Sequence, residues 1–193
     1  MNHDRYDDSY IRGILNTVKT IAMVGASAKD NRPSYFAFKY LMERGYNMIP
    51  INPGLAGKEL LGRKIHGRLS EVPEPIDMVD VFRASKYALP IVQEALTLTP
   101  KPSVIWMQLG IRNDEAAALA EANGMKVVMN RCPKIEYGRL SSEIGWIGVN
   151  SRTLSSKRAQ VFGKGVQRMS LNRSTMAGGS AATRIVREDE KSG

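Results

Sequence analysis

Short apolar runs alternate with longer amphipathic stretches through the first 150 residues of the chain. Runs that are apolar at nearly every position predict strands, and they occupy residues 20–24, 47–51, 78–82, 103–107 and 126–129. Apolar residues at helical spacing predict helices, and this pattern occupies residues 8–19, 34–44, 87–98 and 113–123. Gly45 and Gly124 follow two of these helices, where a left-handed residue commonly ends a helix.

The order of these elements predicts the fold class. Helices and strands alternate along most of the chain, which is the pattern of βα crossover units that build a parallel sheet. Strands that are apolar throughout are typical of sheets covered on both faces. We therefore expect an α/β domain over residues 1–150, with a Rossmann-like open parallel sheet flanked by helices on both faces.

The C-terminal extension, residues 151–193, differs in composition from this domain. It is rich in Ser, Thr, Gly, Arg and Lys without a sustained apolar period, which predicts a flexible tail or an arm laid over a second subunit of a homo-oligomer. Nine Lys or Arg against three Asp or Glu give this tail +6 of the formal net charge of +9. The domain itself is nearly balanced, so the overall charge says little about what it binds.

Composition also bounds the compartment. The single cysteine, Cys132, excludes an internal disulfide and fits a reducing environment. No apolar run approaches the roughly 20 residues that span a bilayer, and the polar, acidic first residues do not form a secretory leader. We expect a cytoplasmic protein without a membrane segment.

The loop after the first predicted strand is a candidate phosphate site, because ligands of open parallel sheets bind where strands end. Gly25, Ala26 and Ser27 follow that strand, and Pro33 opens the next helix. Glycine lets backbone amides approach a phosphate, and a helix N-terminus offers unpaired N–H groups. A plain tight turn is the structural alternative.

A standard dinucleotide site is disfavoured. The motif G-x-G-x-x-G would need glycine at positions that hold Ser27 and Asp30. An NAD site would also need a carboxylate after the second strand, where Asn52 and Pro53 stand. NADP or another phosphorylated adenosine remains open, with Lys58, Arg63 and Lys64 downstream as sources of positive charge or as ordinary solvated side chains.

Five segments carry a resemblance to a known family. They read, in this order, VGASAKDNRPSY, IPINPGLAGKELLG, DMVDVFRAS, IWMQLGI and MNRCPKIEYGRL. Together they closely resemble the stand-alone CoA-binding domain family, which is similar to the nucleotide-binding domain of the succinyl-CoA synthetase α subunit. The resemblance covers about residues 10–145 and leaves the tail outside. Its specific part is the combination of NP after the second strand with NRCPKIE after the last strand.

The resemblance implies coenzyme A (CoA) or an acyl-CoA as the ligand and assigns residues to its parts. The loop for the CoA phosphates corresponds to Gly25, Ala26, Ser27, Arg32, Pro33 and Ser34. The adenosine end corresponds to Asn52 and Pro53, with Lys58 in the basic segment that follows. Walls along the pantetheine arm correspond to Phe82, Arg83, Gln108, Leu109 and Gly110. The motif after the last strand corresponds to Asn130, Arg131, Cys132 and Pro133.

The sequence contains no catalytic motif or metal set that we can identify. The two histidines, His3 and His66, are far apart, and neither a P-loop nor a G-x-S-x-G elbow occurs. Cations beside Cys132 favour a reactive thiolate, but a packed, inert cysteine is the favoured interpretation. We therefore expect a small non-catalytic domain that binds CoA or an acyl-CoA. The alternatives are an NADP-dependent oxidoreductase and a protein that binds nucleic acid through its basic tail.

Overall fold

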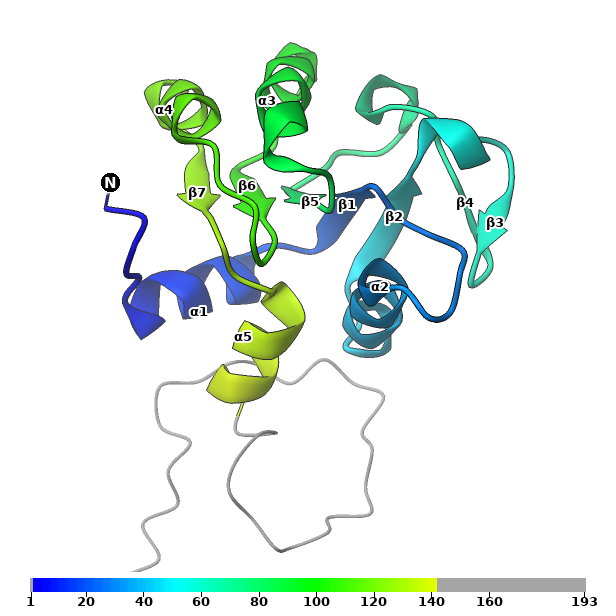
Figure 1. The fold of residues 1–193 in the computed structure, drawn as a ribbon, viewed down its shortest axis with the longest axis horizontal. Helices are drawn as coiled ribbons and strands as arrows, with labels where there is room; N and C mark the ends of the chain where they lie inside the picture. Colours follow the sequence, from blue (N-terminus) through cyan, green and yellow to red (C-terminus); the bar gives the residue numbers. More distant parts are fainter. Residues whose placement is uncertain (1, 142–193) are drawn as a thin grey trace, which may run out of the picture.

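The computed structural model describes residues 2–141 of the chain, which form five helices, seven strands and three short 3-10 turns (Figure 1). The helices are α1 (Asp8–Thr17), α2 (Pro33–Glu43), α3 (Ala88–Thr97), α4 (Asp114–Ala122) and α5 (Pro133–Leu140). The strands are β1 (Thr20–Val24), β2 (Asn47–Ile51), β3 (Glu59–Leu60), β4 (Arg63–Lys64), β5 (Met78–Val81), β6 (Val104–Met107) and β7 (Lys126–Val128).

The main sheet has five parallel strands in the order β2-β1-β5-β6-β7. Taken in chain order, these strands lie as second, first, third, fourth and fifth, which is the flavodoxin-like order of doubly wound sheets. From β1 the chain winds toward β2, and from β5 it winds the opposite way toward β6 and β7. The direction of winding therefore reverses between β1 and β5, and the predicted Rossmann-like α/β class is confirmed.

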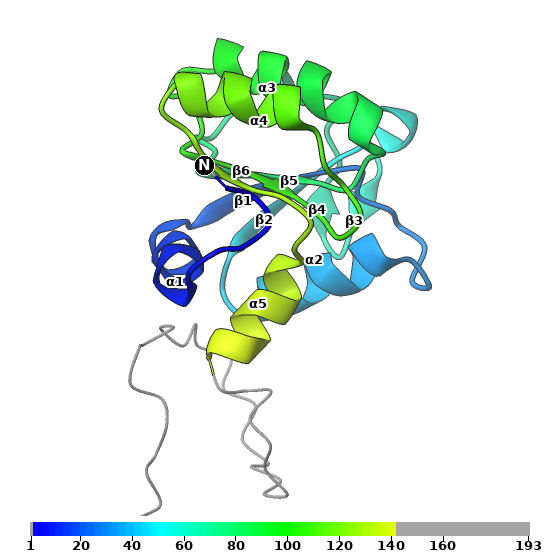
Figure 2. The same cartoon turned by 60° about the vertical axis from the view of Figure 1, so that its left-hand side comes forward.

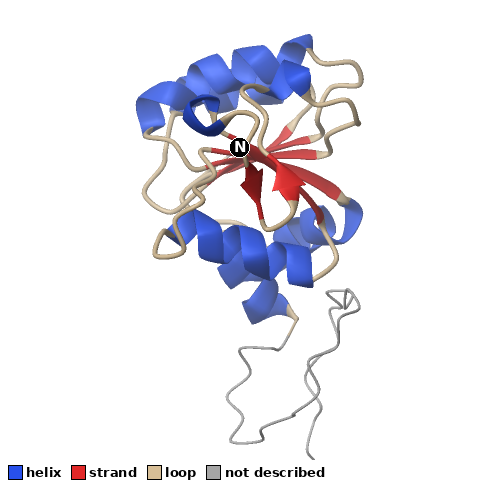
Figure 3. Cartoon of the chain, turned by 90° about the vertical axis from the view of Figure 1, so that its right-hand side faces the viewer, coloured by secondary structure: helices blue, strands red, loops and turns tan. Residues whose placement is uncertain are grey.

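Helices cover the sheet on both faces, with α1, α2 and α5 on one side and α3 and α4 on the other (Figures 2 and 3). Strand side chains alternate between the two layers. Ile21 and Met23 pack into the core beneath α1, α2 and α5, whereas Ala22 and Val24 pack against the α3 and α4 side. Both faces of each strand are thus buried, which is the reason that the strand sequences are apolar without alternation.

The predicted element limits agree with the structure to within one or two residues. Gly45 and Gly124 have φ angles of 84° and 81° after α2 and α4, as expected for left-handed caps. Two features were not expected. Helix α5 begins with Pro133 at its first position, but it is short and its apolar period is weak. The antiparallel pair β3–β4 has two residues in each strand, too few for a period to be visible.

Three predictions made from the sequence concern residues after 141. The C-terminal extension 151–193, the domain boundary near residue 150 and the tail interactions inferred for nucleic acid or a second subunit all lie outside residues 2–141. Within those residues, no helix is both long enough and apolar enough to cross a bilayer.

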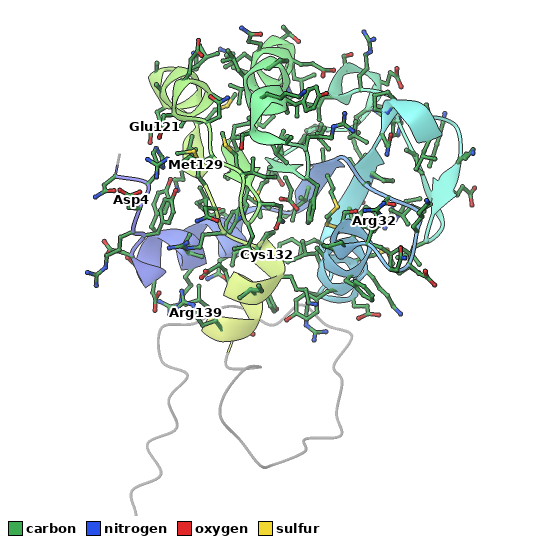
Figure 4. All side chains as sticks on the ribbon, viewed as in Figure 1. Asp4, Arg32, Glu121, Met129, Cys132 and Arg139 are labelled. Atoms are coloured by element: carbon green, nitrogen blue, oxygen red, sulfur yellow. The ribbon has the colours of Figure 1, made fainter. Side chains whose placement is uncertain are left out.

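The free edge of β7 is covered by the N-terminal segment. The Tyr10 hydroxyl accepts a hydrogen bond from the Val127 amide at 3.1 Å and donates to its carbonyl at 3.2 Å. The Tyr6 hydroxyl accepts from the amide of Met129 at 2.7 Å, on the side of the molecule where Asp4 and Glu121 also lie (Figure 4). Because burial dominates, the pKa of Tyr10 is raised to about 12, so the phenol stays protonated. The hydroxyls satisfy edge groups that a further strand would otherwise pair.

Replacing Tyr10 with phenylalanine should destabilise the protein by about 1 kcal/mol, because the edge of β7 loses two hydrogen bonds while ring packing is kept. Urea denaturation of Tyr10→Phe measures the loss. Tyr35→Phe is the matched control, since the Tyr35 hydroxyl makes no hydrogen bond within residues 2–141. Equal stability of the two variants would contradict the role assigned to the Tyr10 hydroxyl.

Candidate functional site

The reversal of winding between β1 and β5 opens the carboxyl edge of the sheet. Gly25 directly follows β1 and has a φ angle of 96°, and its amide donates to the carbonyl of Ile51 at 2.8 Å. The amide of Phe82, just after β5, donates to the carbonyl of Val24 at 2.8 Å. A Cβ at position 25 would lie 2.6 Å from the Phe82 carbonyl oxygen. Glycine is therefore required both by conformation and by the approach of the two loops.

Three hollows adjoin one another along this edge. The large cleft, of about 840 Å³, includes Gly25, Ile51 and Arg83 in its lining. The α2 hollow, of about 360 Å³, also includes Gly25, and it shares Pro33 and Phe82 with the apolar pocket of about 560 Å³. We call the three together the carboxyl-edge groove. These neighbouring hollows lie at the point where ligands of open α/β sheets bind.

The α2 hollow lies at the N-terminus of α2 and is lined by polar and cationic groups. Its polar side chains are Ser27, Lys29, Arg32 and Ser34. No side chain caps α2, since the N-cap residue Arg32 makes no capping hydrogen bond and Pro33 occupies the first turn. The positive end of the helix dipole and two cations thus face the same small space (Arg32 in Figure 4). Such a site favours phosphate or another anion.

The large cleft combines apolar surface with two arginines. Ile51, Pro53 and Ile91 supply aliphatic surface. The guanidinium of Arg83 lies over the ring of Tyr87, 4.8 Å from its centroid, and Arg68 is also in the lining. The lining also includes Glu71 and Glu94, and Arg68 Nε lies 3.9 Å from Glu71 Oε1. Apolar surface beside the Arg83 guanidinium suits a ring that carries a phosphate.

The apolar pocket lies between α2, the ends of β5 and β6, and α5. Its apolar lining residues are Pro33, Phe36, Ala37, Phe82, Leu109, Ile111 and Ile135. Phe36, Leu109 and Ile135 are 52, 56 and 46% exposed although they are large and apolar. Three such side chains around the mouth of one pocket indicate a surface suited to an apolar or thin ligand.

Two buried polar residues, Asp80 and Gln108, lie beside this pocket. Asp80 is fully buried in β5, and Gln108 Nε2 donates to its two carboxylate oxygens at 2.9 and 3.2 Å. Burial, opposed by this hydrogen bonding, raises the pKa of Asp80 to about 7. Sequence reasoning missed Asp80, because it lies inside a strand that was interpreted as apolar. The available signal was a carboxylate in the middle of that strand.

The groove contains many of the residues that the sequence resemblance singled out. The α2 hollow contains Gly25, Ser27, Arg32, Pro33, Ser34 and Phe82. The large cleft contains Pro53 and Arg83. The apolar pocket contains Gln108, Leu109 and Cys132. Burial raises the pKa of the Cys132 thiol, which disfavours a thiolate at that position.

Other predicted residues lie outside the linings of these three hollows: Ala26, Asn52, Lys58, Gly110, Asn130 and Pro133. Two of them shape the loops. Asn52 Nδ2 donates to the Ala26 carbonyl at 2.8 Å. Asn130 adopts a φ angle of 52°, and its Oδ1 accepts from the Gly110 amide at 2.8 Å. Lys58 is exposed near the β3–β4 hairpin.

The two histidines, His3 and His66, occupy different parts of the structure. Residues 2–141 contain no cluster of three or more His, Cys, Asp or Glu side chains that could hold a metal ion. His3 Nδ1 lies 2.9 Å from the Tyr6 hydroxyl in the N-terminal segment. His66 extends the sheet edge beside Ile51 through its backbone.

Comparison with known proteins connects this fold and groove to a family. The family model described as CoA binding domain matches residues 19–138. The protein YneT of Bacillus subtilis is 39% identical over 127 residues, which cover 66% of this chain and 91% of YneT. A solved structure from Pyrococcus horikoshii is 37% identical with a TM-score of 0.67, covering 72% of this chain and 96% of that one.

A partial match reaches a much larger enzyme. The alpha subunit of ADP-forming acetate–CoA ligase I from Pyrococcus furiosus is 31% identical over 80 residues. The match covers 39% of this chain and 17% of the ligase subunit. It therefore concerns a small part of the ligase subunit only.

Replacing Gly25 with alanine should destabilise the protein more than replacing Gly57 with alanine. Both glycines have positive φ angles, but a Cβ at Gly57 meets no atom within 4 Å, whereas one at Gly25 meets the Phe82 backbone. We expect a loss of about 1 kcal/mol for Gly57→Ala and at least about 2 kcal/mol more for Gly25→Ala. Urea denaturation of both variants compares them. Equal losses would show that the two loops do not approach as closely as the structure has them.

Replacing Asp80 with asparagine should change how stability depends on pH. A folded-state pKa near 7 lies above the ordinary value of 3.8, so the folded state binds this proton more tightly. The free energy of unfolding of the wild type should therefore fall as pH rises between these values and then level off. Asp80→Asn lacks this slope and should be the more stable protein by roughly 2–4 kcal/mol at about pH 8. Urea titrations across pH measure the difference, and parallel profiles would contradict it.

Proposed function

We propose, since the chain belongs to the CoA binding domain family, that its carboxyl-edge groove binds CoA or an acyl-CoA. The observation that carries the proposal is the order of the three hollows. A cleft with apolar surface and arginines adjoins a hollow lined by two cations and two serines, which adjoins an apolar pocket. CoA has the same order of chemistry: a phosphorylated adenosine, a diphosphate and a thin arm that ends in the thiol or thioester.

The diphosphate belongs in the α2 hollow. Arg32 and Lys29 supply positive charge there, and the start of α2, which no side chain caps, supplies the positive end of the helix dipole. Ser27 and Ser34 add hydroxyl donors within the same lining. Asn52, which fixes the Ala26 carbonyl, is assigned a supporting role because it holds the loop that forms one wall.

The phosphorylated adenosine belongs in the large cleft. Its ring can lie against Ile51, Pro53 and Ile91, while Arg83 is placed to meet the phosphate on the ribose. Arg68 lies in the same lining, but its Nε is 3.9 Å from Oε1 of Glu71. Lys58 follows Pro53 along the chain and is exposed near this end of the groove, where it is a candidate for long-range attraction.

The arm belongs in the apolar pocket. Phe36, Leu109 and Ile135 would lose exposed apolar surface when an arm lies across them. Gln108 and Cys132 lie in the same lining, and Asn130, Gly110 and Pro133 support the loops on either side of it. A mainly apolar pocket with few polar groups orients a thin ligand.

The proposed role is binding, and no chemical step is assigned to the chain. Ligase activity belongs to the Pyrococcus furiosus subunit, of which the matched segment covers 17%. A domain that holds CoA or an acyl-CoA can carry it, protect it or present it to a partner.

Isothermal titration of the purified protein with CoA, 3′-dephospho-CoA, NAD and NADP tests the proposal. CoA should bind, 3′-dephospho-CoA should bind more weakly because it lacks the ribose phosphate, and NAD should not bind. Arg32→Ala should weaken CoA binding about tenfold to a hundredfold through loss of a charged phosphate contact.

Lys101→Ala is the charge-matched control, because Lys101 is exposed before β6 at the opposite edge of the sheet. It should leave CoA affinity near that of the wild type. Binding of NADP without binding of any CoA species would overturn the proposal. Equal effects of the two variants would show that the α2 hollow does not hold the diphosphate.

A further inference from the structure

The wall of the apolar pocket contains one polar side chain whose orientation is fixed from behind. Gln108 is 4% exposed and follows β6, while Asp80 is completely buried on β5, the neighbouring strand. The Gln108 amide donates through Nε2 to both carboxylate oxygens, at 2.9 and 3.2 Å. A carboxylate can only accept hydrogen bonds. The ionised Asp80 therefore holds the amide with its nitrogen toward the core.

The carbonyl of the same amide is consequently turned away from Asp80. Gln108 Oε1 accepts no hydrogen bond from any group in residues 2–141. This oxygen is not completely buried. Among residues 2–141, the one side-chain nitrogen or oxygen that is completely buried without a hydrogen-bond partner is Nε of Arg12. Gln108 is one of the residues that line the apolar pocket, and we infer that this oxygen faces that space. A nearly buried acceptor without a partner indicates a place for a donor from a ligand.

We propose that Asp80 positions Gln108 so that Oε1 presents one hydrogen-bond acceptor inside the apolar pocket, and that this acceptor recognises an N–H group on an amide-bearing arm. The inference rests on the proposed function and names the part of CoA that the pocket selects. Asp80 acts through Gln108 and is a positioning residue. The amide groups of the pantetheine arm supply the donor, whereas an all-hydrocarbon chain of the same width offers none.

The orientation of the amide depends on the protonation of Asp80. A neutral carboxyl can donate its O–H to Oε1, and the amide then presents its NH₂ group to the pocket instead. The titratable group that interacts with Asp80 is the Cys132 thiol, itself influenced by Lys134. The neighbours of Asp80 in strand register, Met23 on β1 and Trp106 on β6, do not titrate. Protonation of Asp80 should therefore replace an acceptor with a donor at the same position.

The test compares the wild type with Asp80→Asn for two ligands across pH. CoA carries the arm, whereas adenosine 3′,5′-bisphosphate carries the adenosine and two of the three phosphates of CoA, without the arm. For each ligand, we compare the ratio of the two proteins' dissociation constants. Ionisation of the ligand's own phosphates affects both proteins alike, so its effect on affinity drops out of this ratio. For CoA, the wild type should lose about tenfold in affinity relative to Asp80→Asn between about pH 8 and about pH 6. For the bisphosphate, the ratio should stay flat.

Two further variants separate positioning from simple loss of structure. Asp77→Asn changes the other aspartate near β5, whose carboxylate accepts from the Lys19 and Thr20 amides at the opposite edge. The ratio of the CoA dissociation constants of Asp77→Asn and the wild type should not depend on pH. The double variant Asp80→Leu, Gln108→Leu removes both polar partners together and leaves no unpaired buried carboxyl. It should bind the bisphosphate like the wild type and CoA about tenfold more weakly.

The outcomes distinguish the two proposals. If the wild type binds neither ligand, the proposed function itself fails. If it binds both ligands, but Asp80→Asn follows the same pH profile for CoA, the positioning role of Asp80 is overturned. Full CoA affinity in the double leucine variant would likewise overturn the acceptor role of Gln108.

Discussion

Burial of both faces of the central sheet is the constraint on which the site depends. With α1, α2 and α5 on one side and α3 and α4 on the other, no open face of the sheet remains for a ligand (Figure 3). A ligand can therefore approach only at the ends of the strands. The reversal of winding between β1 and β5 separates the helices that follow these two strands. Gly25 lets the two loops meet at that point, where its missing Cβ leaves room for the Phe82 carbonyl.

The groove formed there changes character along its length. Cations and an uncapped helix end surround the α2 hollow, whereas exposed apolar side chains surround the neighbouring pocket. This gradient is set locally by where each strand ends. Residues after β1 line the α2 hollow together with the start of α2, and residues after β6 line the apolar pocket together with the start of α5. Asp80 differs from these residues because it lies inside a strand and not after one. Its buried carboxylate accepts hydrogen bonds from Gln108, a polar residue of the apolar pocket.

Much of the fold could be predicted because its signals are local. Apolar runs marked all five parallel strands, and Gly45 and Gly124 marked helix ends through their conformation. Strand order could not be predicted in this way, since it depends on which elements pack together. The pair of Asp80 and Gln108 is 28 positions apart in sequence and meets only through the register of β5 with β6. Helix α5 lacked a strong period, so the contribution of its Ile135 to the apolar pocket was missed, although the resemblance had assigned Cys132 and Pro133 to the site.

The assignment of CoA to the carboxyl edge is tested most directly by amide NMR spectra of the isotope-labelled protein during titration with CoA. The account predicts that the shifted amides gather at the Gly25–Ser27 loop, at the start of α2 and around Gln108. The amides near Asp77 and Ser103, at the amino edge of the sheet, should stay unchanged. Shifts that gather at the amino edge instead, with none around Gly25, would contradict it.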